Sequence, residues 1–474
     1  MFRIMNLNFN KKDIIHFIGI GGIGMSGIAL ILKQMGYEVQ GSDISKKNKN
    51  IDRLKKNKIK VFDCHKASNI KQSKIIVISS AIKKENPELI QANKLKNILI
   101  IKRADMLAHI ISLKKNIVVS GSHGKTTITS LVSTILKDAH YKPTIVNGGI
   151  INSMNSNANL GNGDWSVIEA DESDGSFLKF NNTHAIVSNI DFEHMDYYKN
   201  FNNLKNQFKI FLEKTPLFGK NIICLDDKNL RKIKAKIKNQ NFITYGFRKE
   251  ANFIPHNIKF KDMKIIFDLK INLKKQTIIK NITLNLIGKH NVLNATASII
   301  AALNIGIPIS KIKKSLKNFS GVQRRMTKIL DYKQRLIFDD YAHHPTEITS
   351  VLSACKSNFM KKRIISVFQP HRYSRVISLY NEFSKCFTLS DLVILCPIYA
   401  AGEKSMIFDL NKFAKNISVK SDVPIVVIKD ENNLEIFLKK NLIKNDIVIS
   451  MGAGNISSWI RNISKNIFDA KIWN

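Results

Sequence analysis

The sequence is poor in cysteine and in long apolar runs, and each shortage excludes a class of protein. Five cysteines are scattered over 474 residues without a CxxC pair, which argues against a disulfide framework and a structural zinc site and suits a reducing compartment. No window carries the roughly 20 apolar residues of a membrane-spanning helix. The N-terminal MFRIMNLNFNKKD lacks the apolar core and cleavage site of a secretory signal. We therefore expect a cytoplasmic protein without membrane insertion.

Acidic residues are also scarce. The chain has 37 Asp and Glu but 75 Lys and Arg, which gives a formal net charge of +38. A large positive charge can indicate nucleic-acid binding. Here the basic residues are spread over the whole chain, as in KKNKNIDRLKKNKIK, and no reader motif with interleaved aromatic residues accompanies them. We expect no specific nucleic-acid partner. The alternative of a basic nucleic-acid binder predicts strongly salt-dependent association.

The length predicts two to four domains, since one hydrophobic core rarely serves so long a chain. Apolar strand-like runs alternate with helical spacing over the first hundred residues, which predicts a parallel sheet of α/β type. A second alternating unit starts at NIVVS, and residues 249–286 resemble short antiparallel strands. A third alternating unit runs from LIFDDYAHH to DIVISMGAGNI. We place the domain boundaries near residues 112 and 320.

The first glycine-rich loop, GIGGIG, follows a strand and opens a helix, and Asp43 ends the next strand. Its glycines are Gly19, Gly21, Gly22 and Gly24. Such glycines let the backbone approach a pyrophosphate at a helix N-terminus, and the acidic residue can accept a ribose hydroxyl. Any diphosphate-bearing nucleotide satisfies this chemistry. Taken alone, the loop leaves an NAD-dependent oxidoreductase open as an alternative.

The second glycine-rich loop predicts a triphosphate site. It comprises Gly121, Ser122, His123, Gly124, Lys125, Thr126 and Thr127. Backbone N–H groups can surround phosphates, Lys125 can contact the outer ones, and the Thr126 hydroxyl can ligate Mg²⁺. The usual first glycine of this motif is replaced by Val119, so we interpret the segment as a shortened phosphate loop.

Two acidic clusters end the following strands, at residues 169–174 (EADESD) and 191–196 (DFEHMD). Carboxylates and an imidazole beside a phosphate loop suit a divalent ion that bridges phosphate oxygens. Alternatively, these residues cap helices and stabilise turns, which fits Ser173 and Asp174. We expect one or two of them to touch metal.

Three basic or polar clusters follow in the last third of the chain: GVQRRM with Arg324 and Arg325, DDYAHHP at 339–345, and QPHRYSR at 369–375. The latter two lie just past apolar strands, where open α/β sheets bind ligands. Their cations can stabilise charge on a phosphoryl or acyl oxygen and bind a small carboxylate. We do not expect the His343/His344 pair to bind metal, because adjacent residues of one strand point to opposite faces.

In this order, the motifs resemble the Mur ligase family over nearly the whole chain, from His16 to Ile456. The matching segments are HFIGIGGIGMSGIA, GSDIS, SSAI, GSHGKTT, IEADESDGSFL, SNIDFEHMD, GKHNVLNA, GVQRRM, DDYAHHPTE, FQPHRYSR, YAAGE and GAGNI. The chain departs from the family pattern at Met326, where an aromatic residue is usual. It also departs at Asp191-Phe192-Glu193, which leaves open which of these carboxylates matters.

The resemblance implies an α/β protein of three domains. These are a Rossmann-like UDP-sugar domain (1–112), a P-loop-type central ATPase domain with an antiparallel sub-sheet (113–320), and a Rossmann-like C-terminal lid that contacts the amino acid (321–474). It implies ATP-dependent, ADP-forming ligation of L-alanine to the lactyl carboxylate of UDP-N-acetylmuramate, through an acyl phosphate, in peptidoglycan synthesis. The cofactors would be ATP and Mg²⁺, as two ions, and the chain a monomer or weak homodimer. A family member that attaches a recycled peptide to the same nucleotide sugar is the alternative.

The resemblance also implies residue roles. For ATP it implies the second loop, His290 and Asn291 at the adenine, and Arg325 and Asp340. For the metal it implies Thr126, Glu169 and His194, and for the UDP sugar the first loop, Asp43, His65 and Arg103. For the amino acid and acyl phosphate it implies His343, His371, Arg372 and Arg375. The residues expected to act in catalysis are Lys125, His194, Arg325, His343, Arg372 and Arg375.

Overall fold

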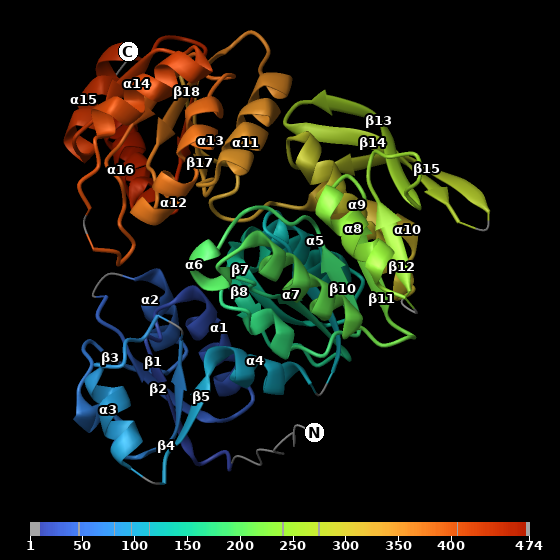
Figure 1. Cartoon of the computed structure of the whole chain (residues 1–474), viewed down its shortest axis with the longest axis vertical. Coiled ribbons are helices and arrows are strands. Elements are labelled where there is room, and N and C mark those ends of the chain that lie inside the picture. Colours follow the sequence, from blue (N-terminus) through green and yellow to red (C-terminus); the bar gives the residue numbers. More distant parts are fainter. Residues whose placement is uncertain are drawn as a thin grey trace. The chain divides into compact units, whose positions relative to one another are not determined.

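The computed structural model describes residues 10–45, 48–79, 81–95, 97–112, 114–238, 241–273, 275–404 and 406–470. The chain forms two compact units (Figure 1). Unit 1 comprises residues 1–256, 268–282 and 293–319, and unit 2 comprises 257–267, 283–292 and 320–474. Among the described residues, no helix combines the length and apolarity needed to cross a bilayer.

The N-terminal part of unit 1 is built on a five-stranded sheet in the order β3-β2-β1-β4-β5. All four strand pairings are parallel, as the strand–helix alternation predicts. The strands are β1 (Ile14–Ile18), β2 (Glu38–Ser42), β3 (Lys60–Phe62), β4 (Ser73–Ile78) and β5 (Leu99–Lys102). Helix α1 (Ile23–Gln34) contacts both α2 (Lys49–Lys56) and α4 (Arg103–Ile111), whereas α3 (Pro87–Lys94) packs on the short helix η1 (Ala67–Ile70).

The second sheet has ten strands in the order β15-β14-β13-β12-β11-β10-β6-β9-β7-β8. Its strands are β6 (Lys115–Ser120), β7 (Thr144–Ile151), β8 (Ser156–Asn159), β9 (Trp165–Glu169), β10 (His184–Val187), β11 (Lys220–Cys224), β12 (Phe242–Tyr245), β13 (Phe253–Lys261), β14 (Lys264–Asn272) and β15 (Gln276–Leu284). Strands β13 and β14 are joined by Asp262 and Met263, both at positive φ. This is the backbone of a tight antiparallel hairpin, as expected for residues 249–286.

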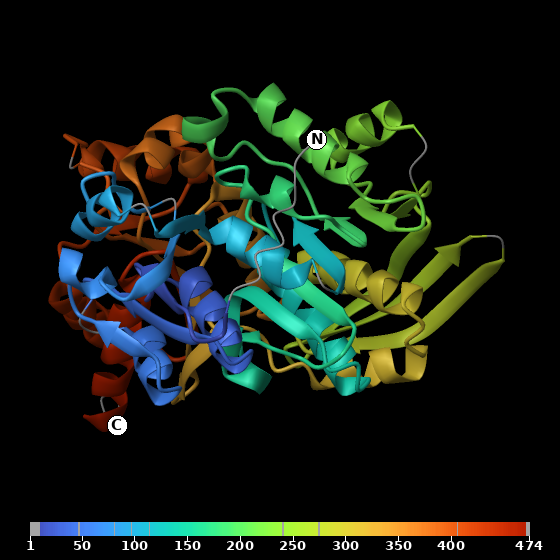
Figure 2. The ribbon, with the colours of Figure 1, turned by 90° about the horizontal axis from the view of Figure 1, so that it is seen from below.

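Helices surround the second sheet (Figures 1 and 2). They are α5 (Lys125–Asp138), α6 (Met195–Tyr198), α7 (Phe201–Glu213), α8 (Lys228–Lys236), α9 (Lys289–Asn304) and α10 (Ile309–Asn318), with η2 (Asn152–Met154) and η3 (Ser176–Lys179). Helix α5 packs on β6, β7 and β9, and all but its two ends is buried. The loop before α5 is thereby fixed at the carboxyl end of β6.

Unit 2 is built on a six-stranded sheet in the order β16-β17-β21-β18-β19-β20. Its strands are β16 (Thr327–Tyr332), β17 (Arg335–Asp340), β18 (Arg363–Phe368), β19 (Leu392–Leu395), β20 (Ile425–Val427) and β21 (Asp446–Met451). Only the β16–β17 pair is antiparallel among the described pairings of this sheet. Its helices are α11 (Pro345–Asn358), α12 (Tyr373–Ser378), α13 (Tyr380–Lys385), α14 (Leu410–Ser421), α15 (Glu431–Asn441) and α16 (Ile456–Asp469).

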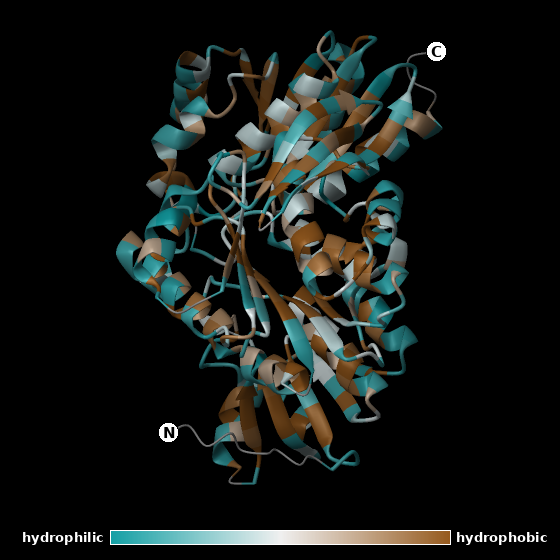
Figure 3. Ribbon diagram, turned by 90° about the vertical axis from the view of Figure 1, so that its right-hand side faces the viewer, coloured by the Kyte–Doolittle hydropathy of each residue, from teal (hydrophilic) through white to brown (hydrophobic). Residues whose placement is uncertain are grey.

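Alternation along the strands of unit 2 creates two cores, one on each face of the sheet. On β18, Ile364 packs with Phe383 and Phe413 of α13 and α14, while Ile365 packs with Ile460 of α16. Successive strand residues point to opposite faces, so a run of apolar residues supplies both cores. In Figure 3, the strands carry much of the brown, apolar colouring.

Candidate active site

The second glycine-rich loop joins β6 to α5 in the way a phosphate-binding loop requires. Gly121 and Gly124 have φ values of 127° and 85°, which favour glycine. A Cβ on Gly124 would lie 2.7 Å from Asn294 Oδ1. The loop therefore tolerates no larger residue there, and its backbone opens the N-terminus of a 14-residue helix, where anions bind favourably.

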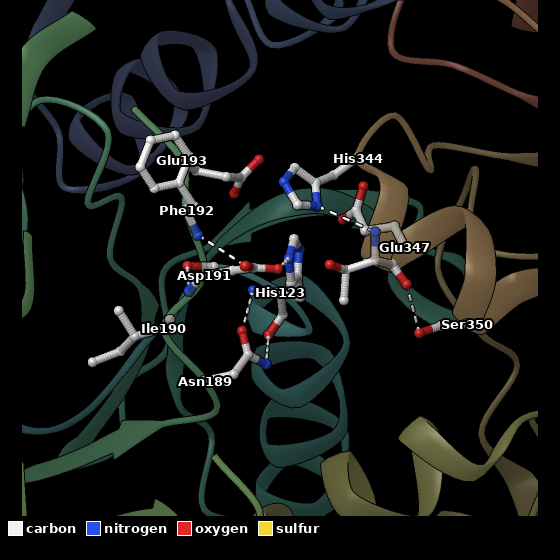
Figure 4. A network of polar contacts seen from close by, with 12 residues as sticks. His123, Asn189, Ile190, Asp191, Phe192, Glu193, His344, Glu347 and Ser350 are labelled. Carbon is white, nitrogen blue, oxygen red and sulfur yellow. Dashed lines mark hydrogen bonds and ion pairs between the residues drawn. The ribbon is translucent and has the colours of Figure 1, made fainter. Parts of the chain in front are cut away.

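Residues after β10 brace this loop from the side (Figure 4). Asn189 accepts from the His123 backbone N–H at 2.8 Å and donates to its carbonyl at 3.1 Å. Asp191 contacts His123 Nε2 at 3.0 Å, and its own N–H donates to Ser122 Oγ at 2.8 Å. Of the two carboxylates that the sequence left open, Asp191 thus fixes the phosphate loop.

Lys125 forms an ion pair at the start of α5. Its Nζ lies 2.8 Å from Glu172 Oε1 and donates to the Gly121 carbonyl at 2.7 Å. Burial by itself lowers the pKa of Lys125, but the charges of Glu172 and Asp171 outweigh it and raise that pKa well above its ordinary value. The ammonium group is therefore permanently charged and held beside the loop.

Glu169, at the end of β9, also contacts α5. Its Oε1 accepts from Thr126 Oγ1 at 3.0 Å, and its Oε2 accepts from the Gly148 N–H at 2.6 Å. Hydroxyl and carboxylate oxygens in one place suit a hard divalent ion. The structure thus brings together Thr126 and Glu169, two of the three residues predicted to ligate metal.

The third predicted ligand, His194, lies with two other carboxylates. Ligand atoms of Glu172, Glu193 and His194 all lie within 4.8 Å of one another. His194 Nε2 is 3.6 Å from Glu172 Oε1 and 4.0 Å from Glu193 Oε2. Glu172 is 1% exposed, and its Oε2 has no hydrogen-bond partner within the described part of the chain. An orphaned buried carboxylate oxygen beside an imidazole fits a divalent cation.

Helix α6 fixes this cluster. The Tyr198 hydroxyl donates to the Glu172 carbonyl, and His194 precedes the helix in a left-handed conformation, with φ 60°. Burial by itself lowers the pKa of His194, but the carboxylates of Glu172 and Glu193 raise it above its ordinary value. The alternative role, in which acidic residues stabilise turns, applies to two other residues of the first acidic cluster. Asp171 accepts from the Ser173 N–H, and Asp174 accepts from the Ser176 N–H.

The first glycine-rich loop is ordered by Asp43. Its Oδ2 accepts from the Gly21 N–H at 2.8 Å and its Oδ1 from the Ser45 N–H at 2.9 Å. Arg103 crosses the same loop, because a Cβ on Gly24 would lie 2.5 Å from its Nη1. Arg103 Nη2 also approaches Asp171 Oδ2 at 3.9 Å. Of the residues predicted for the UDP sugar, Gly19, Gly21, Gly22, Gly24, Asp43 and Arg103 therefore gather at the start of α1.

His65 belongs to a buried network centred on Glu88, at the ends of β2 and β3. Its Nδ1 lies 2.8 Å from Ser42 Oγ and 3.1 Å from Glu88 Oε2. Asn69 donates to Glu88 Oε1 at 2.6 Å. Burial by itself raises the pKa of Glu88, but hydrogen bonds from His16 and Ser42 outweigh it and lower that pKa. The network fixes the His65 ring.

In unit 2, Asp340 and the arginine pair lie together at the end of β17. Asp340 accepts from the N–H groups of Met326 and Ala342 at 2.7 and 2.8 Å. Burial raises the pKa of Asp340 to about 6, although the Arg325 charge opposes the shift. The guanidinium carbons of Arg324 and Arg325 lie 4.7 and 5.5 Å from the Tyr341 ring centroid, within cation–π distance.

His343 and His344 follow β17 rather than lie on it, so the reason given for excluding a metal role is wrong. Strand β17 ends at Asp340, and His344 is the N-cap of α11, with Nδ1 accepting from the Thr346 N–H at 3.3 Å (Figure 4). His343 Nδ1 lies 2.9 Å from the Tyr341 carbonyl. The polar turn diverts the chain before the strand alternation can apply.

His371 and Arg375 pair at the end of β18. Arg375 Nη1 lies 3.2 Å from His371 Nδ1, and the His371 ring stacks on Tyr399 at 5.6 Å and meets His343 at 5.7 Å between centroids. Arg372 has φ 67°, and its buried Nε has no hydrogen-bond partner among the described residues. The four residues predicted to contact the amino acid thus gather in one polar cluster.

The predicted adenine contacts open helix α9. Asn291 Nδ2 donates to the Ile287 carbonyl at 2.7 Å, and a Cβ on Gly288 would lie 2.6 Å from His290 Cε1. Burial and the Arg325 charge lower the pKa of His290 to about 4. A neutral imidazole and an amide suit an uncharged heterocycle.

The sequence did not single out Glu172, Asn189, Tyr341 or Glu403. Glu403 binds the Ser374 N–H at 3.2 Å, and so holds the start of α12. Glu172 and Glu403 lie in the segments EADESD and YAAGE. The sequence therefore indicated the right segments but not these residues. The choice of carboxylate depends on the turn geometry, which the letters do not specify.

The neutral state of His371 is directly testable. Burial and the charges of His343 and Arg375 lower the pKa of His371 to about 3. Because unfolding restores the ordinary value near 6.5, this group favours folding above pH 6.5, and that contribution declines as the pH falls toward 3. In ¹³C-histidine spectra, the signal lost in His371→Gln should keep its neutral position from pH 8 to pH 5. A midpoint above pH 6 would contradict this.

The regions that match known proteins cover nearly the entire chain. Three family models match: "Mur ligase family, catalytic domain" at residues 14–115, "Mur ligase middle domain" at 119–302, and "Mur ligase, glutamate ligase domain" at 324–454. The UDP-N-acetylmuramate–L-alanine ligase of Pelagibacter ubique is 50% identical, over 98% of this chain and 100% of the relative. That of Bartonella bacilliformis is 40% identical over 96% of both chains.

Solved structures agree. The UDP-N-acetylmuramate–alanine ligase of Thermotoga maritima matches with a TM-score of 0.82 and 27% identity, over 96% of this chain and 99% of that chain. A murein peptide ligase of Psychrobacter arcticus matches in fold, with a TM-score of 0.72 and 22% identity over 96% and 98% of the two chains. Three family models that match in order over nearly the whole chain, together with a relative that is 50% identical, establish that this chain belongs to the Mur ligase family.

Proposed function

We propose that the chain is an ATP-dependent, ADP-forming ligase that joins L-alanine to the lactyl carboxylate of UDP-N-acetylmuramate in peptidoglycan synthesis. The family and the names of its similar relatives support the two substrates. The observation that carries the phosphoryl-transfer chemistry is the phosphate loop with Lys125 beside the carboxylates of β9 and the His194 cluster. The same family membership sets aside the NAD-dependent oxidoreductase alternative.

In the first step, an oxygen of the lactyl carboxylate attacks the γ-phosphorus of ATP, and ADP leaves from an acyl phosphate. No protein nucleophile is needed. Catalysis therefore rests on orienting two anions and on neutralising their charge. We assign the phosphates to the N–H groups of residues 121–127 and to Lys125, because the loop geometry favours anions and Lys125 is permanently charged.

We also propose that the enzyme uses two Mg²⁺ ions. Thr126 with Glu169, and His194 with its neighbouring carboxylates, would hold the ions. When bound, the ions neutralise charge on the phosphate oxygens. The hard oxygen donors and the orphaned oxygen of Glu172 support this assignment.

In the second step, the α-amine of L-alanine attacks the acyl carbon, phosphate leaves, and the departing phosphate takes up the proton that the nitrogen loses. We assign this amino acid to His343, His371, Arg372 and Arg375. Because His371 Nδ1 accepts from Arg375, the neutral ring carries its proton on Nε2, which suits donation to a carboxylate. His343 Nδ1 donates to the Tyr341 carbonyl, so its Nε2 is the ring nitrogen that we assign to the substrate.

The remaining assignments rest on the same family likeness. We place the UDP sugar at Gly19, Gly21, Gly22, Gly24, Asp43, His65 and Arg103, and the adenine at His290 and Asn291, with Arg325 and Asp340 also serving ATP. We propose domains at 1–112, 113–320 and 321–474, a cytoplasmic location, and a monomer or weak homodimer.

A substrate panel tests the function. ADP release should require UDP-N-acetylmuramate, MgATP and an amine together, and L-alanine should give the highest kcat/KM among L-alanine, glycine, L-serine and the tripeptide of a recycling ligase. The product should gain the mass of one alanine residue. Preference for the tripeptide would instead assign the chain to the recycling branch of the family.

The acyl phosphate predicts a second product. With hydroxylamine in place of L-alanine, the enzyme should form the hydroxamate of UDP-N-acetylmuramate and release one ADP per hydroxamate. The reason is that hydroxylamine attacks an activated carbonyl as an amine does. A control without ATP should give none. ADP release without hydroxamate would argue against an activated lactyl carboxylate.

Lys125→Ala should abolish turnover and leave the protein folded, as measured by ADP release and circular dichroism. It should also lower the free energy of unfolding by roughly 3 kcal/mol, because the buried Glu172 loses its lysine partner. Lys125→Ala combined with Glu172→Gln should recover stability without recovering turnover. Near-normal ligation by the single variant would overturn the ATP-site assignment.

A further inference from the structure

The pairing of Lys125 with Glu172 is at odds with the work expected of a phosphate-loop lysine. Its Nζ lies 2.8 Å from a carboxylate that is 1% exposed. To contact a triphosphate, the ammonium group must share or leave this partner. A buried carboxylate that loses its cation is strongly destabilising. Binding of a triphosphate therefore raises the question of what replaces Lys125 at Glu172.

The surroundings of Glu172 offer a replacement. Lys125 engages Oε1, whereas Oε2 is buried without a hydrogen-bond partner among the described residues. His194 Nε2 lies 3.6 Å from Oε1, and a Glu193 oxygen lies within 4.8 Å of both. The orphaned oxygen shows that the side chain has coordinating capacity that its ion pair does not use.

The backbone of Glu172 is held independently of this pair. Its carbonyl accepts from the Tyr198 hydroxyl and from the Gly175 N–H, the latter at 3.1 Å. Since these contacts involve main-chain atoms, the carboxylate can change its partner without movement of the loop. Glu172 thus has a fixed backbone and two nitrogen groups near its carboxylate, Lys125 Nζ and His194 Nε2.

We propose that Glu172 exchanges partners during the ligase cycle. It neutralises Lys125 when the phosphate loop is empty and holds a divalent cation, with His194 and Glu193, once Lys125 has turned to the triphosphate. The inference rests on the proposed ATP site and deepens it. It makes triphosphate and metal binding mutually dependent, because either one alone leaves a buried charge uncompensated.

Glu172→Gln separates this exchange from a structural role, because it moves two affinities in opposite directions. The non-hydrolysable ATP analogue AMP-PCP, in EDTA, should bind about fivefold more tightly or better, since Lys125 is released. With AMP-PCP present, electron paramagnetic resonance should show at least about tenfold weaker binding of one Mn²⁺. Weakening of both affinities would indicate structural damage, and no change in either would also overturn the proposal.

Glu169→Gln is the matched control, because Glu169 accepts a hydrogen bond from Thr126, whereas the direct ion pair of Lys125 is with Glu172. It should weaken Mn²⁺ binding without tightening AMP-PCP in EDTA. An equal gain in that variant would show that general loss of negative charge, rather than release of Lys125, explains the result. Both titrations omit UDP-N-acetylmuramate and L-alanine. A wild-type enzyme that fails to release ADP with all substrates would refute the proposed function and leave these titrations to decide the exchange.

Discussion

The phosphate site depends on one constraint, the common direction of strands β6, β9 and β10. Strand β6 pairs in parallel with both of the others, so their carboxyl ends lie at one edge of the sheet. The loop after β6 supplies Lys125, the turn after β9 supplies Glu172, and the segment after β10 supplies His194. Segments up to 69 residues apart in the sequence, such as Ser122 and Asp191, are thereby within hydrogen-bonding distance. Without the parallel pairing, none of these polar groups would meet.

This constraint explains how far the sequence could predict the site. Strand–loop–helix order located both glycine loops and both acidic clusters, because an apolar run followed by glycine or acid marks a strand end. It could not decide among carboxylates. Glu172 rather than Glu169 meets Lys125 and His194 because the turn at Gly175 and the left-handed His194 fold the two segments together. Such torsions depend on tertiary packing, which motif letters do not encode.

Other residues make contacts that their predicted roles did not include. Asp43 was predicted to meet a ribose, and the sequence left open which of Asp191 and Glu193 matters. In the structure, both aspartates hold the backbones or side chains of the loops beside them. A loop that binds phosphate through bare N–H groups needs outside acceptors to keep its shape. The departure at His343 and His344 has a similar origin, because β17 ends at Asp340 and the polar turn imposes its own geometry.

The need to neutralise charge explains why ionised groups such as Lys125 and Glu172 are buried despite their desolvation cost. The proposed ligation uses no protein nucleophile, so the enzyme must bring carboxylate and triphosphate together against their repulsion. A glutamine at 172 would remove the desolvation cost of a buried carboxylate, but it would also leave nothing to link the lysine with a metal. Unit 2 uses neutral groups instead of an ion pair. His371 and His290 lie among arginines, and their lowered pKa values keep them neutral. Neutral imidazoles there add hydrogen bonds without adding to the positive charge, so the arginines keep their attraction for anionic substrates.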